Sequence, residues 1–142
     1  MIDAHRIAPK LWIGSYPTDP RVCEQFDLIV LCAMELQSLR FPCRSAILHV
    51  PLDDAEPTRH EVSVALRAAK EVAEARRQGK RVLVTCAQGV NRSSLVAAMS
   101  LAKSGMPPKI AIELIREQRK PPSGMRPLCN PHFVRLLMRM VG

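Results

Sequence analysis

The sequence of 142 residues predicts a single α/β domain over residues 1–142, with three layers and a mostly parallel central sheet flanked by helices. Three observations support this. Hydrophobic residues make up 47% of the chain and charged residues 24%, as in ordinary globular domains. Short apolar runs alternate with segments of helical periodicity, and the prolines fall between these segments. A chain of this length can bury about two thirds of its unfolded surface, which is enough for one core.

The first half of the chain contains three predicted strands and one short helix. Leu11–Gly14 is a short run that favours a first strand. Residues 19–26 begin with Asp-Pro, a typical helix start. Residues 28–32 are continuously apolar, as in a central strand covered on both faces. Residues 47–52 form another strand, and Pro51 indicates that this strand is ending or lies near an edge.

The second half of the chain contains one predicted strand and four helices. Residues 58–61 read Thr-x-x-Glu, the spacing of a capping box, and an apolar stripe continues from there to Gly79. Residues 81–84 form a buried strand. Residues 95–102 are apolar nearly all round, which predicts a helix enclosed by the domain. Two further helices are expected to begin at Pro108 and at Asn130-Pro131.

Composition also indicates where in the cell the protein resides and what it binds. The formal net charge is +8, but the Lys and Arg residues are scattered, which favours a solvated basic surface over a nucleic-acid footprint. No apolar run approaches the roughly 20 residues that a bilayer span needs. The first residues lack the basic and apolar stretches of a secretory signal. We therefore expect a cytoplasmic protein without membrane contact, and a monomer.

The cysteines favour neither a disulfide framework nor a zinc site. Their number is odd and no two form a C-x-x-C pair. We expect free thiols in a reducing compartment, and no bound metal. The five cysteines are Cys23, Cys32, Cys43, Cys86 and Cys129.

Residues 82–94 combine a buried strand, a tight loop and a helix start. Such a loop can turn its backbone N–H groups toward an anion, and the helix dipole adds partial positive charge there. Gly89 permits the turn, and Arg92 can hold two phosphate oxygens at once. These groups favour the thiolate of Cys86, which would attack phosphorus, while Ser93 can donate a hydrogen bond to the sulfur. The predicted phosphate-binding residues are Ala87, Gln88, Gly89, Val90, Asn91 and Arg92.

The pattern Cys86-x5-Arg92-Ser93 resembles the signature loop of the protein tyrosine phosphatase superfamily. Residues 11–14, 50–54, 111–116 and 130–137 are similar to segments of its dual-specificity branch. The resemblance implies a dual-specificity-phosphatase-like fold and a phosphatase without metal or organic cofactor. It also implies four roles, namely nucleophile for Cys86, phosphate clamp for Arg92, thiolate partner for Ser93 and general acid for Asp54.

The general acid must protonate the departing oxygen, and Asp53 competes with Asp54 for this role. Residues 50, 52 and 54 share one face of a strand, so Asp54 lies on the sheet-facing register if Val50 and Leu52 point inward. We therefore favour Asp54. The alternative without a catalytic role is that both carboxylates belong to a solvated acidic turn with Glu56.

Thr85 departs from the resembled pattern, in which histidine usually precedes the cysteine. We expect the Thr85 hydroxyl to replace part of the imidazole's hydrogen bonding to the loop. A looser loop and reduced activity would follow.

Three functions fit these residues. The first is hydrolysis of phosphotyrosine and of phosphoserine or phosphothreonine in proteins. The second is removal of RNA 5′-phosphates, favoured by the net charge and by residues 89–92, which are similar to the loop of the RNA triphosphatase branch. The third is a catalytically weak module that binds phosphoproteins, favoured by Thr85. A sulfur-transfer domain also uses a loop cysteine, but Arg92 and Ser93 fit phosphate better.

Overall fold

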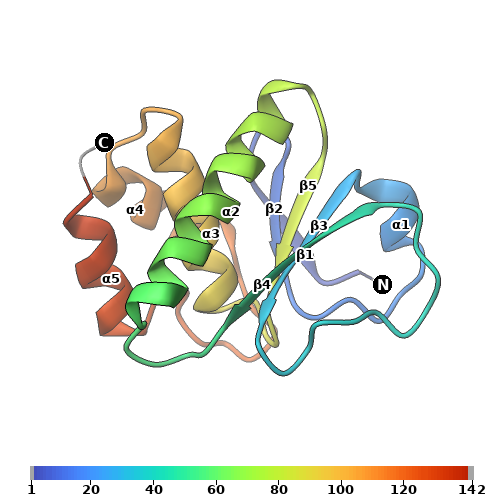
Figure 1. Cartoon of the computed structure of the whole chain (residues 1–142), viewed down its shortest axis with the longest axis horizontal. Coiled ribbons are helices and arrows are strands. Elements are labelled where there is room, and N and C mark those ends of the chain that lie inside the picture. The colour runs from blue at the N-terminus through green and yellow to red at the C-terminus, as the bar shows by residue number, and fades with distance from the viewer. Residues whose placement is uncertain (1, 141–142) are drawn as a thin grey trace.

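Ten helices and strands make up the computed structural model, which describes residues 2–140 (Figure 1). Met1 and residues 141–142, the ends of the predicted domain 1–142, lie outside the described residues. The elements are β1 Ala4–Ala8, β2 Leu11–Gly14, α1 Val22–Gln25, β3 Leu28–Ala33, β4 Ala46–Leu52, α2 Arg59–Arg77, β5 Val82–Thr85, α3 Arg92–Lys103, α4 Pro108–Gln118 and α5 Pro131–Met138.

The strands of the described chain form one sheet in the order β1-β2-β5-β3-β4. The last four strands of this order run parallel, and β1 pairs antiparallel with β2. The prediction of a mostly parallel sheet is confirmed. Strand β5, which leads directly to Cys86, occupies the middle, and β4 lies at an edge, as Pro51 indicates.

Strand β1 is absent from the sequence-based prediction. Polar His5 and Arg6 interrupt its apolar pattern, and of its five residues only Ile7 is buried. An edge strand of this kind is defined by its pairing with β2 rather than by its own periodicity.

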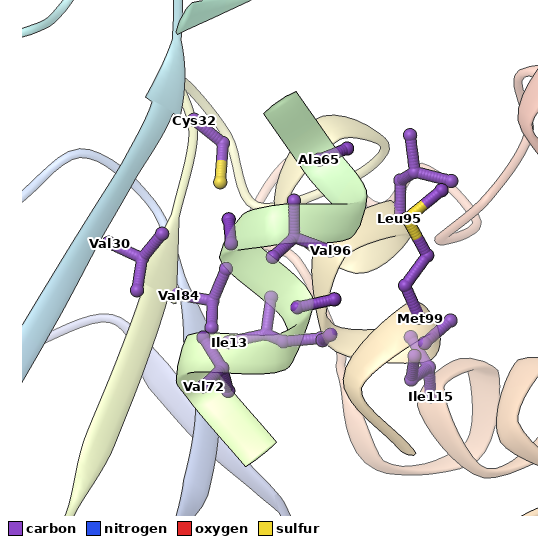
Figure 2. Packing of buried hydrophobic residues seen from close by; sticks show 14 of the residues in the cluster. Ile13, Val30, Cys32, Ala65, Val72, Val84, Leu95, Val96, Met99 and Ile115 are labelled. Atoms are coloured by element: carbon purple, nitrogen blue, oxygen red, sulfur yellow. The ribbon is translucent and has the colours of Figure 1, made fainter. Parts of the chain in front are cut away.

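The two faces of the sheet are covered unequally. Helices α2 to α5 pack on one face, and Figure 2 shows Ile13, Val30 and Val84 of the sheet beside Val72 of α2 and Val96 of α3. The other face carries only α1 and neighbouring loops, around a smaller buried cluster of Val22, Phe26, Ile29, Leu31 and Leu83. The structure is therefore an α/β fold with one thick and one thin helical layer.

The helix starts follow local chemistry. The capping box of α2 is present, because Glu61 N donates to Thr58 Oγ1 at 3.1 Å and Thr58 N donates to Glu61 Oε1 at 3.0 Å. Asn130 caps α5 by accepting from His132 N at 2.9 Å. Helix α3 is buried from Arg92 to Ala102, which confirms the enclosed central helix.

The expectation of free thiols is wrong for two cysteines. Cys23 of α1 and Cys43 form a disulfide with a Cα–Cα distance of 5.4 Å. Spacing along the chain conceals this pair, because 20 residues separate the cysteines and only the fold brings them together. Cys32, Cys86 and Cys129 are free.

Candidate active site

The loop that follows β5 places the predicted nucleophile beside its predicted partner. We call residues 86–92 the phosphate loop. Cys86 Sγ lies 3.2 Å from Ser93 Oγ, and both residues are buried. Gly89 has a φ of +67°, so the loop takes the left-handed turn that the sequence requires of it. A pocket of about 290 Å³ opens over the loop. It is lined by Glu35, Asp54, Cys86, Ala87, Gln88, Val90, Asn91, Arg92 and Met125.

Arg92 is held by a carboxylate that sequence patterns do not reveal. Its Nη1 donates to Glu35 Oε1 at 2.5 Å and to the Leu52 carbonyl at 3.1 Å, and its Nη2 donates to Glu35 Oε2 at 3.1 Å. Glu35 comes from the turn after β3, 57 residues away in the chain. Within the described chain, Nε has no hydrogen-bond partner, so the Nε–Nη2 edge of the guanidinium can still face two phosphate oxygens.

The electrostatics of this pair keep both groups charged. The hydrogen bond from Arg92 holds the pKa of Glu35 below its ordinary value. Burial alone would lower the pKa of Arg92, but its hydrogen bond with the Glu35 carboxylate raises it. Arg92 therefore brings a full positive charge to the pocket wall.

Asp54 faces the same pocket from the segment after β4. Its Oδ2 accepts from Asn91 Nδ2 at 3.0 Å, and its Oδ1 accepts from Asn130 Nδ2 at 2.8 Å. The neighbouring Asp53 does not line the pocket, and its Oδ1 accepts from Asp54 N at 2.9 Å. The sequence favoured Asp54 on the assumption that Val50 and Leu52 point inward, and both of these side chains are buried.

Behind the phosphate loop lies a second arginine that sequence reasoning missed. Arg119 is 0% exposed, and its Nε and Nη2 donate to the carbonyls of Gly89 and Gln88 at 3.0 and 2.9 Å. Asp3 of the N-terminal segment accepts from both of its terminal nitrogens, at 2.8 and 2.9 Å. Because the Gln88 and Gly89 carbonyl oxygens point toward Arg119, the N–H groups of the same two peptide units are free to point toward the pocket.

Gly89 also has no room for a side chain. A Cβ atom there would lie 2.4 Å from Arg119 Nη2 and 2.7 Å from the Gly14 carbonyl oxygen. The glycine thus serves both the positive φ and the close approach of the buried arginine.

Comparison with protein family models identifies the family of this chain. The family model described as the dual specificity phosphatase catalytic domain matches residues 11–140. The chain belongs to the dual specificity phosphatase family. The resemblance carried by Cys86-x5-Arg92-Ser93 is thereby confirmed. Comparison with curated protein sequences gave no match.

Solved structures of dual specificity and tyrosine phosphatases share the fold. A mouse putative dual specificity phosphatase, complexed with zinc tungstate, is 23% identical with a TM-score of 0.80 over 98% of this chain and 86% of its own. Human DUSP28 is 24% identical with a TM-score of 0.76, over 96% and 90%. The tyrosine phosphatase OH1 from the Orf virus is 22% identical with a TM-score of 0.73, over 97% and 86%.

Thr85 has a different role in this phosphatase from the one expected. Its Oγ1 donates to the Val30 carbonyl at 2.9 Å, so the hydroxyl is used within the sheet and does not hydrogen-bond the phosphate loop. The expectation that it replaces imidazole contacts to the loop is wrong. The parallel register explains this, because Thr85 is still a strand residue paired beside Leu31 of β3.

From residue 2 to 140, no helix is both long and apolar enough to cross a membrane. Among the same residues, no group of three or more His, Cys, Asp or Glu side chains could hold a metal ion.

Proposed function

We propose that this phosphatase hydrolyses phosphotyrosine and phosphoserine or phosphothreonine in proteins through a phosphocysteine on Cys86. One observation carries the proposal. The Cys86 sulfur, hydrogen-bonded with Ser93 Oγ at 3.2 Å, lies in the same pocket as Arg92 and Asp54. A nucleophile, a cation for the phosphate oxygens and an acid for the leaving group are thus within reach of one substrate.

The first chemical step forms the sulfur–phosphorus bond. The phosphate loop, with Ala87 to Asn91 and the start of α3, binds the phosphate oxygens through backbone N–H groups, and Arg92 takes two oxygens through its free edge. The Cys86 thiolate attacks phosphorus as the bond to the side-chain oxygen breaks. The carboxyl group of Asp54 gives its proton to that oxygen.

The second step returns the enzyme to its starting state. Water attacks the phosphocysteine, Asp54 accepts the proton from that water, and the sulfur leaves as a thiolate. The hydrogen bond from Ser93 stabilises the charge that develops on the departing sulfur. Inorganic phosphate then dissociates from the loop.

The substrate class is supported by the walls of the pocket. Met125, 47% exposed, also lines the pocket and offers an apolar contact for the carbon atoms of a phosphorylated side chain. OH1 from the Orf virus, which shares the fold, is described as a tyrosine phosphatase with triple substrate specificity, and this supports the proposal of more than one substrate class here.

The experiment compares hydrolysis of p-nitrophenyl phosphate and a phosphotyrosine peptide in the presence of a chelator. Cys86→Ser should abolish both reactions. Asp54→Ala should lower kcat/KM for the peptide by about 10²–10⁴-fold, and kcat/KM for p-nitrophenyl phosphate much less, because kcat/KM reports the first step and p-nitrophenolate leaves in that step without a proton. Asp53→Ala is the matched control and should remain close to wild type.

Each alternative has its own signature in this experiment. Full activity of Cys86→Ser would overturn the mechanism, and equal losses in the two aspartate variants would leave the acid unassigned. RNA 5′-triphosphate turnover faster than peptide turnover would assign the site to RNA. Phosphopeptide binding with turnover no higher than that of Cys86→Ser would make the protein a binding module.

A cytoplasmic location and a monomeric state stay predictions from the sequence. The Cys23–Cys43 disulfide stands against the reducing compartment behind the first of them, because disulfides are rare in cytosolic proteins. Thiol counting on protein extracted with and without reductant tests this point directly.

A further inference from the structure

A groove of about 730 Å³ lies at the end of α3 remote from the phosphate loop. Helix α3 begins at Arg92 beside the pocket and ends at Lys103 beside this groove, a span of roughly 17 Å at the helical rise. Its walls are formed by the C-terminal ends of α2 and α3 and by the β1–β2 turn. These lie at the end of the sheet where β5 begins (Figure 1). Its lining residues are Pro9, Lys10, Lys70, Ala73, Glu74, Arg76, Arg77, Lys103 and Ser104, which together we call the basic groove.

Charge in the basic groove is strongly one-sided, with five basic residues and one carboxylate. Arg77 pairs with that carboxylate, since its Nη2 lies 2.5 Å from Glu74 Oε1. Arg76 donates from Nε and Nη2 to the Pro9 carbonyl, at 3.0 and 2.9 Å. In residues 2–140, the three lysines of the groove make no hydrogen bond or ion pair through Nζ. The pKa of Asp27 is lowered mainly by hydrogen bonds from Arg81, and the charge of Lys10 adds to this.

Helix dipoles explain only part of this arrangement. Cations in the last turns of helices are favourable, which accounts for Arg76 and Arg77 in α2 and Lys103 in α3. Lys70 lies two turns before the end of α2, and Lys10 lies in the β1–β2 turn. Lys10 has a φ of +64°, where glycine or asparagine would be favoured. The turn thus carries a lysine at a position where backbone conformation alone favours another residue.

Arg76 has no carboxylate partner in the basic groove, because Glu74, the one carboxylate of its lining, pairs with Arg77. Its guanidinium is half-buried, its hydrogen bonds go to an uncharged carbonyl, and burial lowers its pKa. A cation removed from water without a negative partner is costly, so an anion bound beside it would be stabilising.

We propose that the basic groove binds an acidic segment of a protein partner, whose carboxylates pair with Lys10, Lys70 and Lys103. Its volume lies within the roughly 300–1,000 Å³ of ligand-sized clefts. Ala73, Pro9 and the lysine methylene groups give it an apolar floor for the peptide backbone and side chains. This inference concerns binding and does not depend on the catalytic mechanism.

The same lining disfavours nucleic acid as the occupant. It contains no aromatic side chain on which a base could stack. The forks of both arginines, which suit carboxylates and phosphates alike, are already engaged with Glu74 and Pro9. The donors that remain are lysine ammonium groups, mobile point charges to which a flexible acidic peptide can adjust. The missing aromatic side chains therefore decide against single-stranded nucleic acid.

The test measures the binding of a fluorescein-labelled octaglutamate peptide by fluorescence anisotropy at low and physiological salt. The groove variant is Lys10→Asn/Lys70→Gln/Lys103→Gln. Its three positions are exposed, and asparagine tolerates the positive φ of Lys10. The matched control, Arg40→Gln/Arg44→Gln/Arg139→Gln, removes the same charge from exposed residues outside the groove.

The groove variant should bind octaglutamate about tenfold more weakly than wild type, with a smaller salt dependence, and the control variant should lose less than about twofold. Hydrolysis of p-nitrophenyl phosphate by the groove variant should be unchanged, and octaglutamate should not compete with that substrate. Equal losses in both variants, absence of binding to the wild type, or competition with p-nitrophenyl phosphate would overturn the proposal. Tighter, groove-dependent binding of labelled oligouridylate would replace the acidic peptide with nucleic acid.

Discussion

The two ends of helix α3 differ in how their charged groups are held. At the phosphate loop, each polar group of the proposed chemistry has a partner: Cys86 has Ser93, Arg92 has Glu35, and Asp54 has Asn91 and Asn130. At the basic groove, three lysines make no hydrogen bond or ion pair through Nζ within the described chain. Both ends attract anions, but only one of them fixes its side chains in advance.

This difference separates the requirements of chemistry from those of docking. Displacement at phosphorus needs the sulfur, the acid and the cation in one geometry, so their positions are set by contacts made before the substrate arrives. A flexible acidic partner can adjust to lysines that keep their rotamer freedom. Loosening the contacts at the phosphate loop should therefore lower activity more than changing contacts remote from it.

Loosening the support behind the phosphate loop should have the largest effect. Arg119→Lys keeps the positive charge beside Asp3 but lacks the fork that reaches the Gln88 and Gly89 carbonyls. We expect kcat for p-nitrophenyl phosphate to fall by about 10²-fold, because small displacements of reacting groups are costly. Steady-state kinetics and denaturant unfolding should be measured together.

Arg76→Lys is the matched control for this variant. Arg76 lies on α2, and its Nε and Nη2 also donate to a backbone carbonyl, that of Pro9, which is remote from the phosphate loop. It should lower stability without a comparable loss of kcat. Equal losses of kcat in the two variants would show that Arg119 has no special part in holding the loop.

Removing the partner of Arg92 should have a smaller effect. Glu35→Gln keeps the shape of the side chain but removes its charge, and we expect kcat/KM to fall about fivefold, as for an exposed ion pair of about 1 kcal/mol. Because its hydrogen bond with Arg92 lowers the pKa of Glu35, the ion pair exists at all pH values above that lowered pKa and is lost only in stronger acid. The pH profile between 5 and 8 should therefore drop uniformly. A shift of its acidic limb would contradict this account.

The disulfide should have the smallest effect on activity. It closes a 20-residue segment next to the thin layer of the fold, and its loss should reduce the free energy of unfolding by about 3 kcal/mol. Thermal unfolding of Cys23→Ser/Cys43→Ser, with and without reductant, measures this change. The variant should keep its kcat and should no longer respond to reductant. A large loss of kcat would show that the two regions are coupled.

Sequence reasoning found the parts of the site that are contiguous in the chain. Residues 86–93 carry the spacing of the phosphate loop on one strand, one turn and one helix start, so local rules suffice. Strand alternation favoured Asp54, which does line the pocket, but β4 ends at Leu52 and contacts with Asn91 and Asn130 hold the carboxylate there. Its role as acid remains a proposal. The capping residues of α2 and α5 were predictable for the same local reason.

The supports of the site could not be found in this way. Glu35 and Arg92 are 57 residues apart, and Arg119 and Asp3 are 116 residues apart, so only the sheet order brings each pair together. Asn130 reads as a helix cap, and its second contact, with Asp54, spans 76 residues. The Cys23–Cys43 disulfide and the hydroxyl contact of Thr85 likewise depend on neighbours that the sequence does not indicate.

The most direct measurement is rapid acid quenching of Asp54→Ala mixed with p-nitrophenyl phosphate, followed by mass spectrometry of the cleaved protein. A good leaving group keeps the first step fast, while loss of the base slows hydrolysis of the intermediate, so the phosphorylated enzyme should accumulate. The phosphocysteine mechanism predicts a burst of p-nitrophenol equal to the enzyme concentration and a phosphate group on Cys86. Turnover without a burst and without phosphate on Cys86, or phosphate on another residue, would contradict it.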